Sequence, residues 1–381
     1  MRYVKPDYFD EFRCAAGNCP DTCCAGWQII IDDSSLERYG QDRSAFGNRL
    51  LNGIDWSDGS FLQDCGRCSM LNEQNLCELV IAKGEDWLCE TCSRYPRHVE
   101  EFEGLREWSL SLSCPVAAKL ILSHKSPVQF LTTEDEEPDP LEDEFEDFDF
   151  LLFTQLEDAR NVLLAIVQNR TLSIEKRMGL ILTMAEKMQD CIDEEHLYEM
   201  DEVIQSYVGY TAKANNHDNY EYIASLDGEE RYRKLCEGFS YLEQMERLRD
   251  EWSEVLQETK KTLYTKGYES YQEISLAFQK EFVRERSRQE QWADFMENLL
   301  LFFLYTYFCG AVYDDWVYSK AALSVFCTVF IQEFVMSRWF LADKQIDMQD
   351  CIELAYRFAR EVEHSDENLN FLEECLNGET A

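Results

Sequence analysis

Apolar residues recur at steps of three and four positions over most of the chain from residue 150 onward. In residues 151–169 this period gathers one apolar face, made of Leu152, Leu156, Val162, Leu163, Ile166 and Val167. The same spacing predicts helices at residues 176–187, 230–256, 271–308, 319–339 and 348–364, with Ser173 and Ser365 as N-caps of the second and the last short helix. No proline interrupts this half. The pattern predicts a mainly α protein whose residues 150–381 form an all-helical C-terminal domain.

The first 126 residues carry shorter signals. Residues 27–31, WQIII, predict a strand that ends at Asp32. In residues 102–113 a period of two places Trp108, Leu110 and Leu112 on one side. This alternation predicts a half-buried strand, the second arm of a hairpin that turns near Gly104. We therefore expect residues 1–126 to form a domain with a few short strands.

Residues 134–149 separate these two regions. They contain eleven acidic residues, two prolines and no basic residue. Repulsion between the carboxylates and the spacing of the prolines disfavour a packed element. We expect a linker over residues 127–149.

The chain is strongly acidic, with 36 Lys and Arg against 75 Asp and Glu, a formal net charge of −39. Such a surface repels phosphate backbones, which excludes a general nucleic-acid role. It attracts lysine-rich protein surfaces. The alternative is that the acidic residues only keep the protein soluble. The longest apolar stretch, residues 299–313, is too short to cross about 30 Å of hydrocarbon, so we expect a buried helix and no membrane insertion. The opening residues lack the apolar core of a secretory signal, which favours a cytoplasmic protein.

Ten of the 16 cysteines fall in the first 114 residues. In a reducing compartment, clustered thiols bind metal more often than they pair as disulfides. One group lies in CAAGNCPDTCCAGW, where small and turn-forming residues let a loop fold around a metal; the second contains two C-x-x-C pairs, Cys65 with Cys68 and Cys89 with Cys92. These spacings predict a metal-binding N-terminal domain. The ligand candidates are Cys14, Cys19, Cys23, Cys24, Cys68, Cys77, Cys89 and Cys92; Cys65 and Cys114 are less certain.

Both zinc and an iron–sulfur cluster accept four thiolates, and the sequence leaves this choice open. Histidine is scarce near the cysteines, so few residues could supply the nitrogen ligands of a mixed Cys and His zinc site. A Cys-x3-Cys-x2-Cys run is absent, which argues against the usual radical S-adenosylmethionine enzyme. The sequence also lacks the glycine-rich nucleotide motifs and the G-x-S-x-G hydrolase elbow.

Three stretches together resemble the flagellin lysine-N-methylase family. They are FRCAAGNCPDTCCAGWQIIID; CSMLNEQNLCELVIAKGEDWLCETCSRYPRHV followed by LSLSCP; and, more weakly, YRFAREVEHSDENL near the C-terminus. Parts of the first two stretches are also similar to small zinc- or iron-chelating proteins. That similarity supports an alternative, a non-catalytic zinc- or iron-binding module that acts as a sensor or an assembly partner.

The family resemblance implies transfer of methyl groups from S-adenosylmethionine to lysine side chains of flagellin, by an enzyme that carries an iron–sulfur cluster of the 4Fe-4S type. Four of the eight candidate cysteines would bind it. Which four cysteines bind it stays open. Beside the cysteines, Tyr95 and His364 are the candidate catalytic residues, with a purely structural role as the alternative for each. Residues that would contact the donor are the arginines that can hold its carboxylate and the rings that can face its sulfonium: Arg94, Arg97, Trp27 and Trp108. Charge neutralisation and core packing are the alternatives for these four.

Overall fold

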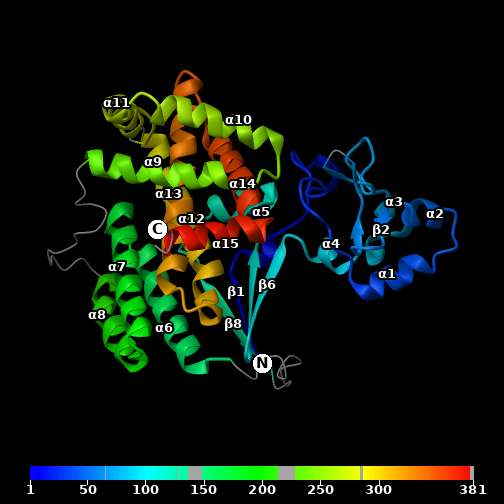
Figure 1. The fold of residues 1–381 in the computed structure, drawn as a ribbon, viewed down its shortest axis with the longest axis horizontal. Helices are drawn as coiled ribbons and strands as arrows, with labels where there is room; N and C mark the ends of the chain where they lie inside the picture. Colours follow the sequence, from blue (N-terminus) through cyan, green and yellow to red (C-terminus); the bar gives the residue numbers. More distant parts are fainter. Residues whose placement is uncertain (65, 126, 136–147, 213–227, 284–285, 378–381) are drawn as a thin grey trace.

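The computed structural model describes residues 1–64, 66–125, 127–135, 148–212, 228–283 and 286–377. The chain folds into two unequal lobes (Figure 1). The small lobe, at the right of Figure 1, is built from cysteine-rich segments between residues 14 and 94. The larger lobe combines the helices of the C-terminal part with a sheet formed by N-terminal segments. The prediction of a mainly α protein with a few short strands is confirmed.

The sheet of the larger lobe has four strands in the order β6-β7-β1-β8. Its strands are β1 (Arg2–Pro6), β6 (Arg97–Phe102), β7 (Leu105–Leu110) and β8 (Phe130–Glu134). β1 runs parallel to β7, and the other neighbours are antiparallel. β6 and β7 form the predicted hairpin, which turns at Gly104 with φ +69°, a conformation that glycine adopts without strain. β8 lies within the segment predicted as a linker, whose residues 136–147 fall outside the described part.

The small lobe consists of very short elements. Its helices are α1 (Asp33–Gly40), α2 (Gly47–Leu51), α3 (Glu78–Lys83) and α4 (Glu90–Arg94), and its strands are β2 (Ile54–Asp55), β3 (Ser60–Phe61), β4 (Gln63–Asp64) and β5 (Arg67–Cys68). The strand predicted at residues 27–31 is wrong, because this segment makes only an isolated bridge between Ile30 and Ser60. Its neighbour β3 is only two residues long, so no longer ladder forms.

The larger lobe is helical from residue 148 to the end of the described residues, as predicted. Its helices are α5 (Pro115–Leu122), α6 (Phe150–Val167), α7 (Ile174–Asp193), α8 (Met200–Ala212), α9 (Gly228–Gln244), α10 (Asp250–Thr259), α11 (Tyr268–Phe278), α12 (Arg286–Tyr307), α13 (Val317–Leu341), α14 (Met348–Glu363) and α15 (Asp366–Leu376). Ser173 and Ser365 are N-caps, and each side-chain oxygen accepts from a backbone amide of the first turn. The sequence pattern missed α5 and α8.

Two predicted helices are interrupted. The helix expected at residues 230–256 is divided into α9 and α10, because backbone amides between them donate to α14 and α15: Leu248 N to Glu361 (3.0 Å) and Glu246 N to Asn368 (2.8 Å). The helix expected at residues 271–308 becomes α11, a π turn at Gln279–Val283, and α12. At this turn the ring of Phe278 packs edge-on against Trp339 of α13, with centroids 5.4 Å apart. Tertiary contacts therefore decide where these helices end.

The buried side chains form two hydrophobic cores. One core lies in the small lobe and includes Ile29, Tyr39, Phe61 and Cys89. The other joins the helices to the sheet and to the N-terminal residues Tyr8, Phe9 and Phe12. The division at residues 126 and 149 stays a prediction; the packing shows that strands from the N-terminal part complete the core of the helical lobe.

Two helical segments, Arg288–Tyr313 and Val317–Leu341, are long and apolar enough to span a membrane. Their apolar windows are 83% and 89% buried inside the fold, as in core helices of soluble proteins. The predicted buried helix at residues 299–313 belongs to the first of them. The expectation of no membrane insertion is not tested by this packing.

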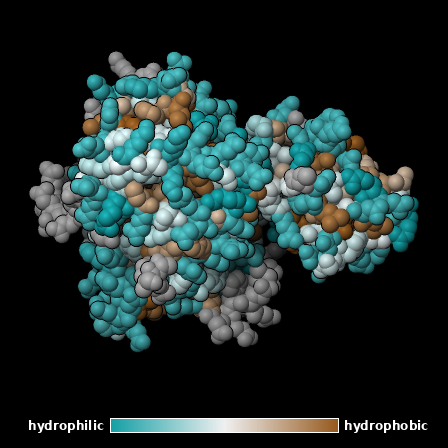
Figure 2. Space-filling view, turned by 45° about the horizontal axis from the view of Figure 1, so that its top comes forward, coloured by the Kyte–Doolittle hydropathy of each residue, from teal (hydrophilic) through white to brown (hydrophobic). Residues whose placement is uncertain are grey.

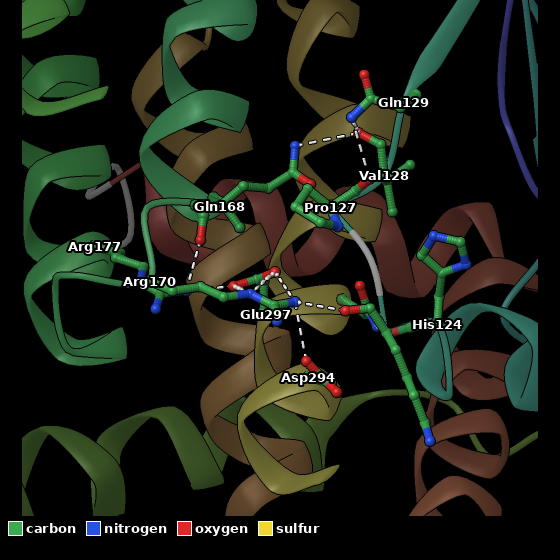
Figure 3. A network of polar contacts seen from close by, with 12 residues as sticks. His124, Pro127, Val128, Gln129, Gln168, Arg170, Arg177, Asp294 and Glu297 are labelled. Atoms are coloured by element: carbon green, nitrogen blue, oxygen red, sulfur yellow. Dashed lines mark hydrogen bonds and ion pairs between the residues drawn. The ribbon is translucent and has the colours of Figure 1, made fainter. Parts of the chain in front are cut away.

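Buried ion pairs connect the elements of the larger lobe. Figure 3 shows Glu297 of α12 facing Arg170, in the turn between α6 and α7, and Arg177 of α7. Each arginine lies 2.8 Å from a Glu297 oxygen, and Arg170 also donates to the carbonyl of Lys125 at 3.2 Å. A second pair joins the sheet to the helices, because both oxygens of Glu107 on β7 accept from Arg160 on α6. These contacts fix the sheet and the chain leading to β8 against the helices.

Candidate functional site

Three of the predicted site residues meet where the lobes contact one another. The ring of Trp27 stacks on His364 with centroids 4.8 Å apart, and Tyr95 lies edge-on to His364 at 5.8 Å. Trp27 and Tyr95 are 5.6 Å apart. We call Trp27, Tyr95 and His364 the aromatic triad. Trp27 packs against the small core and Tyr95 against the larger one, so the triad joins the two lobes.

Local structure positions each member of the triad. His364 is the C-cap of α14, and Figure 1 shows that the corner between α14 and α15 faces the small lobe. Tyr95 follows α4 directly and precedes β6. The indole of Trp27 donates to the carbonyl of Cys23 at 2.6 Å, which ties the ring to the first cysteine loop.

Ser113, in the turn between β7 and α5, supplies the polar contacts of the triad. Its hydroxyl lies 3.0 Å from His364 Nε2 and 3.2 Å from the Tyr95 hydroxyl. Its backbone amide and that of Leu112 donate to the carboxylate of Glu363, at 2.7 and 3.2 Å. Imidazole, phenol, hydroxyl and carboxylate thus form one hydrogen-bonded group.

Two arginines of the helical lobe hold the first cysteine loop beside the triad. Arg360 of α14 lies 2.6 Å from one oxygen of Asp21, and Arg249 lies 3.1 Å from the other. Arg360 also donates to the carbonyls of Ser113 (2.8 Å) and Asp21 (2.9 Å), and Arg249 donates to that of Ala25 (2.5 Å). The ion pairs of Asp21 with Arg249 and Arg360 thus attach this loop to the helical lobe.

Burial determines the protonation of the group. Burial, reinforced by Arg360 and Arg249, lowers the pKa of His364 to about 3, so its imidazole is neutral at pH 7. Burial raises the pKa of Tyr95 well above its usual value, which keeps the phenol protonated. Burial also raises the pKa of Glu363 to about 7, although hydrogen bonds from Ser113 and Leu112 oppose this shift. Near neutral pH, Glu363 is therefore the group that most readily exchanges a proton.

The N-terminal cysteines form two sets. Cys14, Cys19, Cys23 and Cys114 interact electrostatically with one another, and Cys23 and Cys114 also interact with Tyr95. We call these four the interface thiols. The other set, the core thiols, belongs to the core of the small lobe and comprises Cys24, Cys68, Cys77, Cys89 and Cys92. Cys65 lies outside the described residues, and the fifteen described cysteines are free thiols.

The donor chemistry of both sets suits metal binding. Thiolates are the ligands that zinc and iron–sulfur clusters take, and metal-bound thiolates accept backbone amide hydrogens. Ala16 N, for example, lies 3.3 Å from Cys14 Sγ. Among the described residues, however, no three Cys, His, Asp or Glu side chains converge tightly enough to hold a metal ion as they stand. Metal binding by the eight predicted cysteines therefore stays a prediction.

The other predicted donor-contact residues make contacts with residues outside the triad. Arg94 is exposed and pairs with Glu90 one helical turn earlier. The Arg97 guanidinium lies over the ring of Phe12, 5.2 Å from its centroid. Trp108, on β7, packs edge-on against Phe9 at 5.9 Å. The role of these three residues toward a donor stays a prediction.

Sequence reasoning missed Ser113, Glu363, Arg360 and Asp21 as members of this group. Ser113 and Glu363 do stand beside predicted residues, Cys114 and His364. The sequence carries no signal that Ser113 contacts His364, however, because 251 positions separate them.

Comparison with known proteins places most of the helical lobe in one family. A family model described as the FliB lysine N-methylase C-terminal domain matches residues 160–380, which include Arg249, Arg360 and His364. The flagellar biosynthetic protein FliU of Salmonella muenchen is 30% identical over 129 residues, which are 32% of this chain and 76% of FliU. The lysine-N-methylases of Salmonella typhimurium and Salmonella choleraesuis are each 29% identical over 129 residues, 32% of this chain and 32% of each relative. The match thus spans about a third of those two enzymes. No solved structure matches the chain.

Proposed function

The chain belongs to the FliB lysine N-methylase family, and from this premise we propose that it is a protein-lysine N-methyltransferase that takes its methyl group from S-adenosylmethionine and modifies flagellin. The family match covers more than half of the chain, from residue 160 to residue 380. The names of the relatives, lysine-N-methylase and flagellar biosynthetic protein, support the reaction and the flagellar substrate. The net charge of −39 favours approach of a lysine-bearing protein surface. We further propose that the reaction takes place in the cytoplasm, where thiols stay reduced.

The reaction makes three demands on the site. The lysine ammonium must lose its proton, and the neutral amine then attacks the methyl carbon in line. An N–C bond forms while the C–S bond breaks, and its electron pair leaves with the sulfur. The site must therefore accept one proton, align two partners and tolerate positive charge on both.

The aromatic triad is the observation that carries this proposal. Ring faces attract cations, so Trp27 and Tyr95 suit a sulfonium or an ammonium group. The neutral imidazole of His364 adds no positive charge that would repel them. Glu363, with its pKa near 7, is the proton acceptor that we assign to the lysine ammonium.

We propose that the interface thiols hold the iron–sulfur cluster that the sequence resemblance implies. This choice takes Cys14, Cys19 and Cys23 from the eight predicted ligands and adds Cys114. Cys23 and Cys114 interact with Tyr95, and the Asp21 contacts with Arg249 and Arg360 hold the loop of Cys14, Cys19 and Cys23 in place. When bound, the cluster supplies coordination bonds that fix this loop and position the donor, without redox turnover. The alternative is a zinc ion bound by the same four cysteines, and metal analysis distinguishes zinc from an iron–sulfur cluster.

The test combines donor binding with methyl transfer. Titration calorimetry measures S-adenosylmethionine binding to the anaerobically purified protein, and a labelled donor reports methyl incorporation into flagellin. Trp27→Ala should weaken donor binding at least about tenfold, because a desolvated cation–ring contact contributes about 2 kcal/mol. Trp56→Ala is the matched control, since Trp56 is an exposed tryptophan of the same lobe (49%), and it should bind like the wild type.

A wild-type protein that neither binds the donor at millimolar concentration nor methylates flagellin would overturn the proposal and favour a non-catalytic metal-binding module. Equal loss of donor binding in Trp27→Ala and Trp56→Ala would instead remove the triad from the site.

A further inference from the structure

Each polar group of Ser113 is held by the end of α14. Its carbonyl accepts from Arg360 at 2.8 Å, its amide donates to Glu363 at 2.7 Å, and its hydroxyl lies 3.0 Å from His364 Nε2. These three residues are spaced three and four positions apart from Arg360, so they share one face of the last turn. Ser113 itself is fully buried. The position of its hydroxyl is therefore fixed by the surrounding structure.

The hydroxyl of Ser113 lies between two rings of the aromatic triad. It is 3.2 Å from the Tyr95 hydroxyl on one side and 3.0 Å from His364 Nε2 on the other. A hydroxyl carries one proton, so it donates in one of these two bonds and accepts in the other. Two proton arrangements satisfy this condition, and they differ in which nitrogen of the neutral His364 ring carries hydrogen.

Tyr95 decides between the two arrangements. In the first, Tyr95 donates to Ser113 and Ser113 donates to Nε2, so the hydrogen of His364 is on Nδ1. In the second, Nε2 carries the hydrogen and both bonds reverse, which leaves the phenol hydrogen without an acceptor among the described residues. The phenol is desolvated, and a buried donor without an acceptor costs free energy. The first arrangement is therefore favoured.

The other ring nitrogen of His364 is available to a ligand. Within the described part of the chain, the imidazole makes its one hydrogen bond through Nε2. Nδ1 has no such partner and is not sealed inside the fold, so solvent reaches it. Each ring of the triad is partly exposed, and mostly hydrophilic side chains border the junction of the two lobes on the face drawn in Figure 2. A ligand bound beside the triad can therefore contact Nδ1.

We propose that Ser113 is a positioning residue that holds His364 in the Nδ1–H tautomer, so that this N–H donates to an oxygen of the methyl donor. S-adenosylmethionine offers carboxylate and ribose oxygens as acceptors, whereas a lysine ammonium has only donors and cannot take this bond. Trp27 stacks on the same imidazole, with centroids 4.8 Å apart, and holds its plane. The identity of the ligand rests on the proposed function; the tautomer does not.

The tautomer is tested by nuclear magnetic resonance on the anaerobically purified, full-length protein labelled with ¹⁵N-histidine. Protonated and unprotonated ring nitrogens have well-separated ¹⁵N shifts, and the signals lost in His364→Asn are those of His364. The wild type should carry hydrogen on Nδ1 without any methyl donor present. Ser113→Ala removes the hydroxyl, so the fixed tautomer should be lost. Ser109→Ala, at a buried serine of β7 (6% exposed) that does not bond to the ring, should keep it.

Donor binding is tested with two substitutions of His364. Asn and Gln both remove the ring, but an Asn amide reaches the place of Nδ1 and a Gln amide reaches that of Nε2. His364→Asn should therefore bind S-adenosylmethionine roughly three- to tenfold more tightly than His364→Gln, the range for one hydrogen bond. Titration calorimetry measures both affinities. This pair tests the contact even if Ser113→Ala does not fold.

A wild type with hydrogen on Nε2, or the same tautomer in Ser113→Ala as in the wild type, would overturn the role of Ser113. Equal donor affinity of His364→Asn and His364→Gln would show that Nδ1–H does not reach the ligand. A wild type that shows the Nδ1–H tautomer but binds no S-adenosylmethionine would contradict the proposed function and the ligand assigned here, while it confirms the role of Ser113. The two failures are thus distinguished.

Discussion

At the scale of single residues, Glu363 carries the sharpest chemical distinction. Its neighbour on the same helix, Glu361, also has its pKa raised by burial to about 7. Glu361, however, accepts from Leu248 N at 3.0 Å, in the loop between α9 and α10. Glu363 accepts from Leu112 and Ser113, and the hydroxyl of Ser113 contacts both His364 and Tyr95. Two carboxyls with similar acidity thus differ in whether they border the triad.

We expect Glu363→Gln to reduce the methyl-transfer rate about 10²- to 10⁴-fold, the range for loss of a proton acceptor, with donor affinity unchanged. Wild-type activity should rise with pH through about 7 as Glu363 loses its proton, and this rise should vanish in the variant. Rates and donor binding measured from pH 6 to 9 check both points, with Glu361→Gln as control. An unchanged pH profile in Glu363→Gln would exclude Glu363 as the acceptor.

At the scale of elements, buried ion pairs fix the sheet to the helices. The side chains of Glu107 and Arg160 are 3% and 4% exposed, so losing one partner leaves the other charge uncompensated in a medium that solvates it poorly. The pair Arg94–Glu90 on α4 is the opposite case, because both side chains are at least half exposed. Solvent screens that pair, and its contribution to stability is small.

We therefore expect Glu107→Gln to lower the free energy of unfolding by about 3–5 kcal/mol, and Glu90→Gln to lower it by less than about 1 kcal/mol. Urea denaturation followed by circular dichroism measures both values. Similar values for the two variants would show that the buried pair does not stabilise the joint between β7 and α6.

At the scale of the whole molecule, folding buries several carboxyl groups of this strongly acidic chain, and burial raises their pKa. Burial raises the pKa of Glu333, Glu361 and Glu363 from 4.5 to about 7. The folded protein therefore holds these protons more tightly than the unfolded chain does. Their stabilising effect is complete below about pH 4.5 and is lost as the pH rises through about 7. Repulsion among the many exposed carboxylates acts in the same direction.

The melting temperature should consequently fall between pH 5 and pH 8. Glu333 lies on α13, and its oxygens accept from the hydroxyls of Tyr264 (2.9 Å) and Tyr271 (3.0 Å), far in sequence from the N-terminal cysteines. Glu333→Gln removes one titrating group, so its melting temperature should fall less steeply with pH than that of the wild type. Differential scanning calorimetry at several pH values checks this, and parallel slopes would contradict it.

The sequence by itself determined the local features of this protein. Periodic apolar positions specified the helices, serine side chains capped α7 and α15, and alternation around Gly104 specified the hairpin, because each depends on residues only a few positions apart. Cysteine spacing and family resemblance also pointed to Trp27, Tyr95 and His364 as site residues.

Only the tertiary structure decided which of these residues meet. Contacts of Glu361 and Asn368 divide the helix expected at residues 230–256, and the short partner β3 prevents the strand expected at residues 27–31. The triad draws on positions 27, 95 and 364, and the thiols divide between a lobe interface and a lobe core. Spacing along the chain cannot specify such contacts, because the packing of buried surfaces from distant segments determines them.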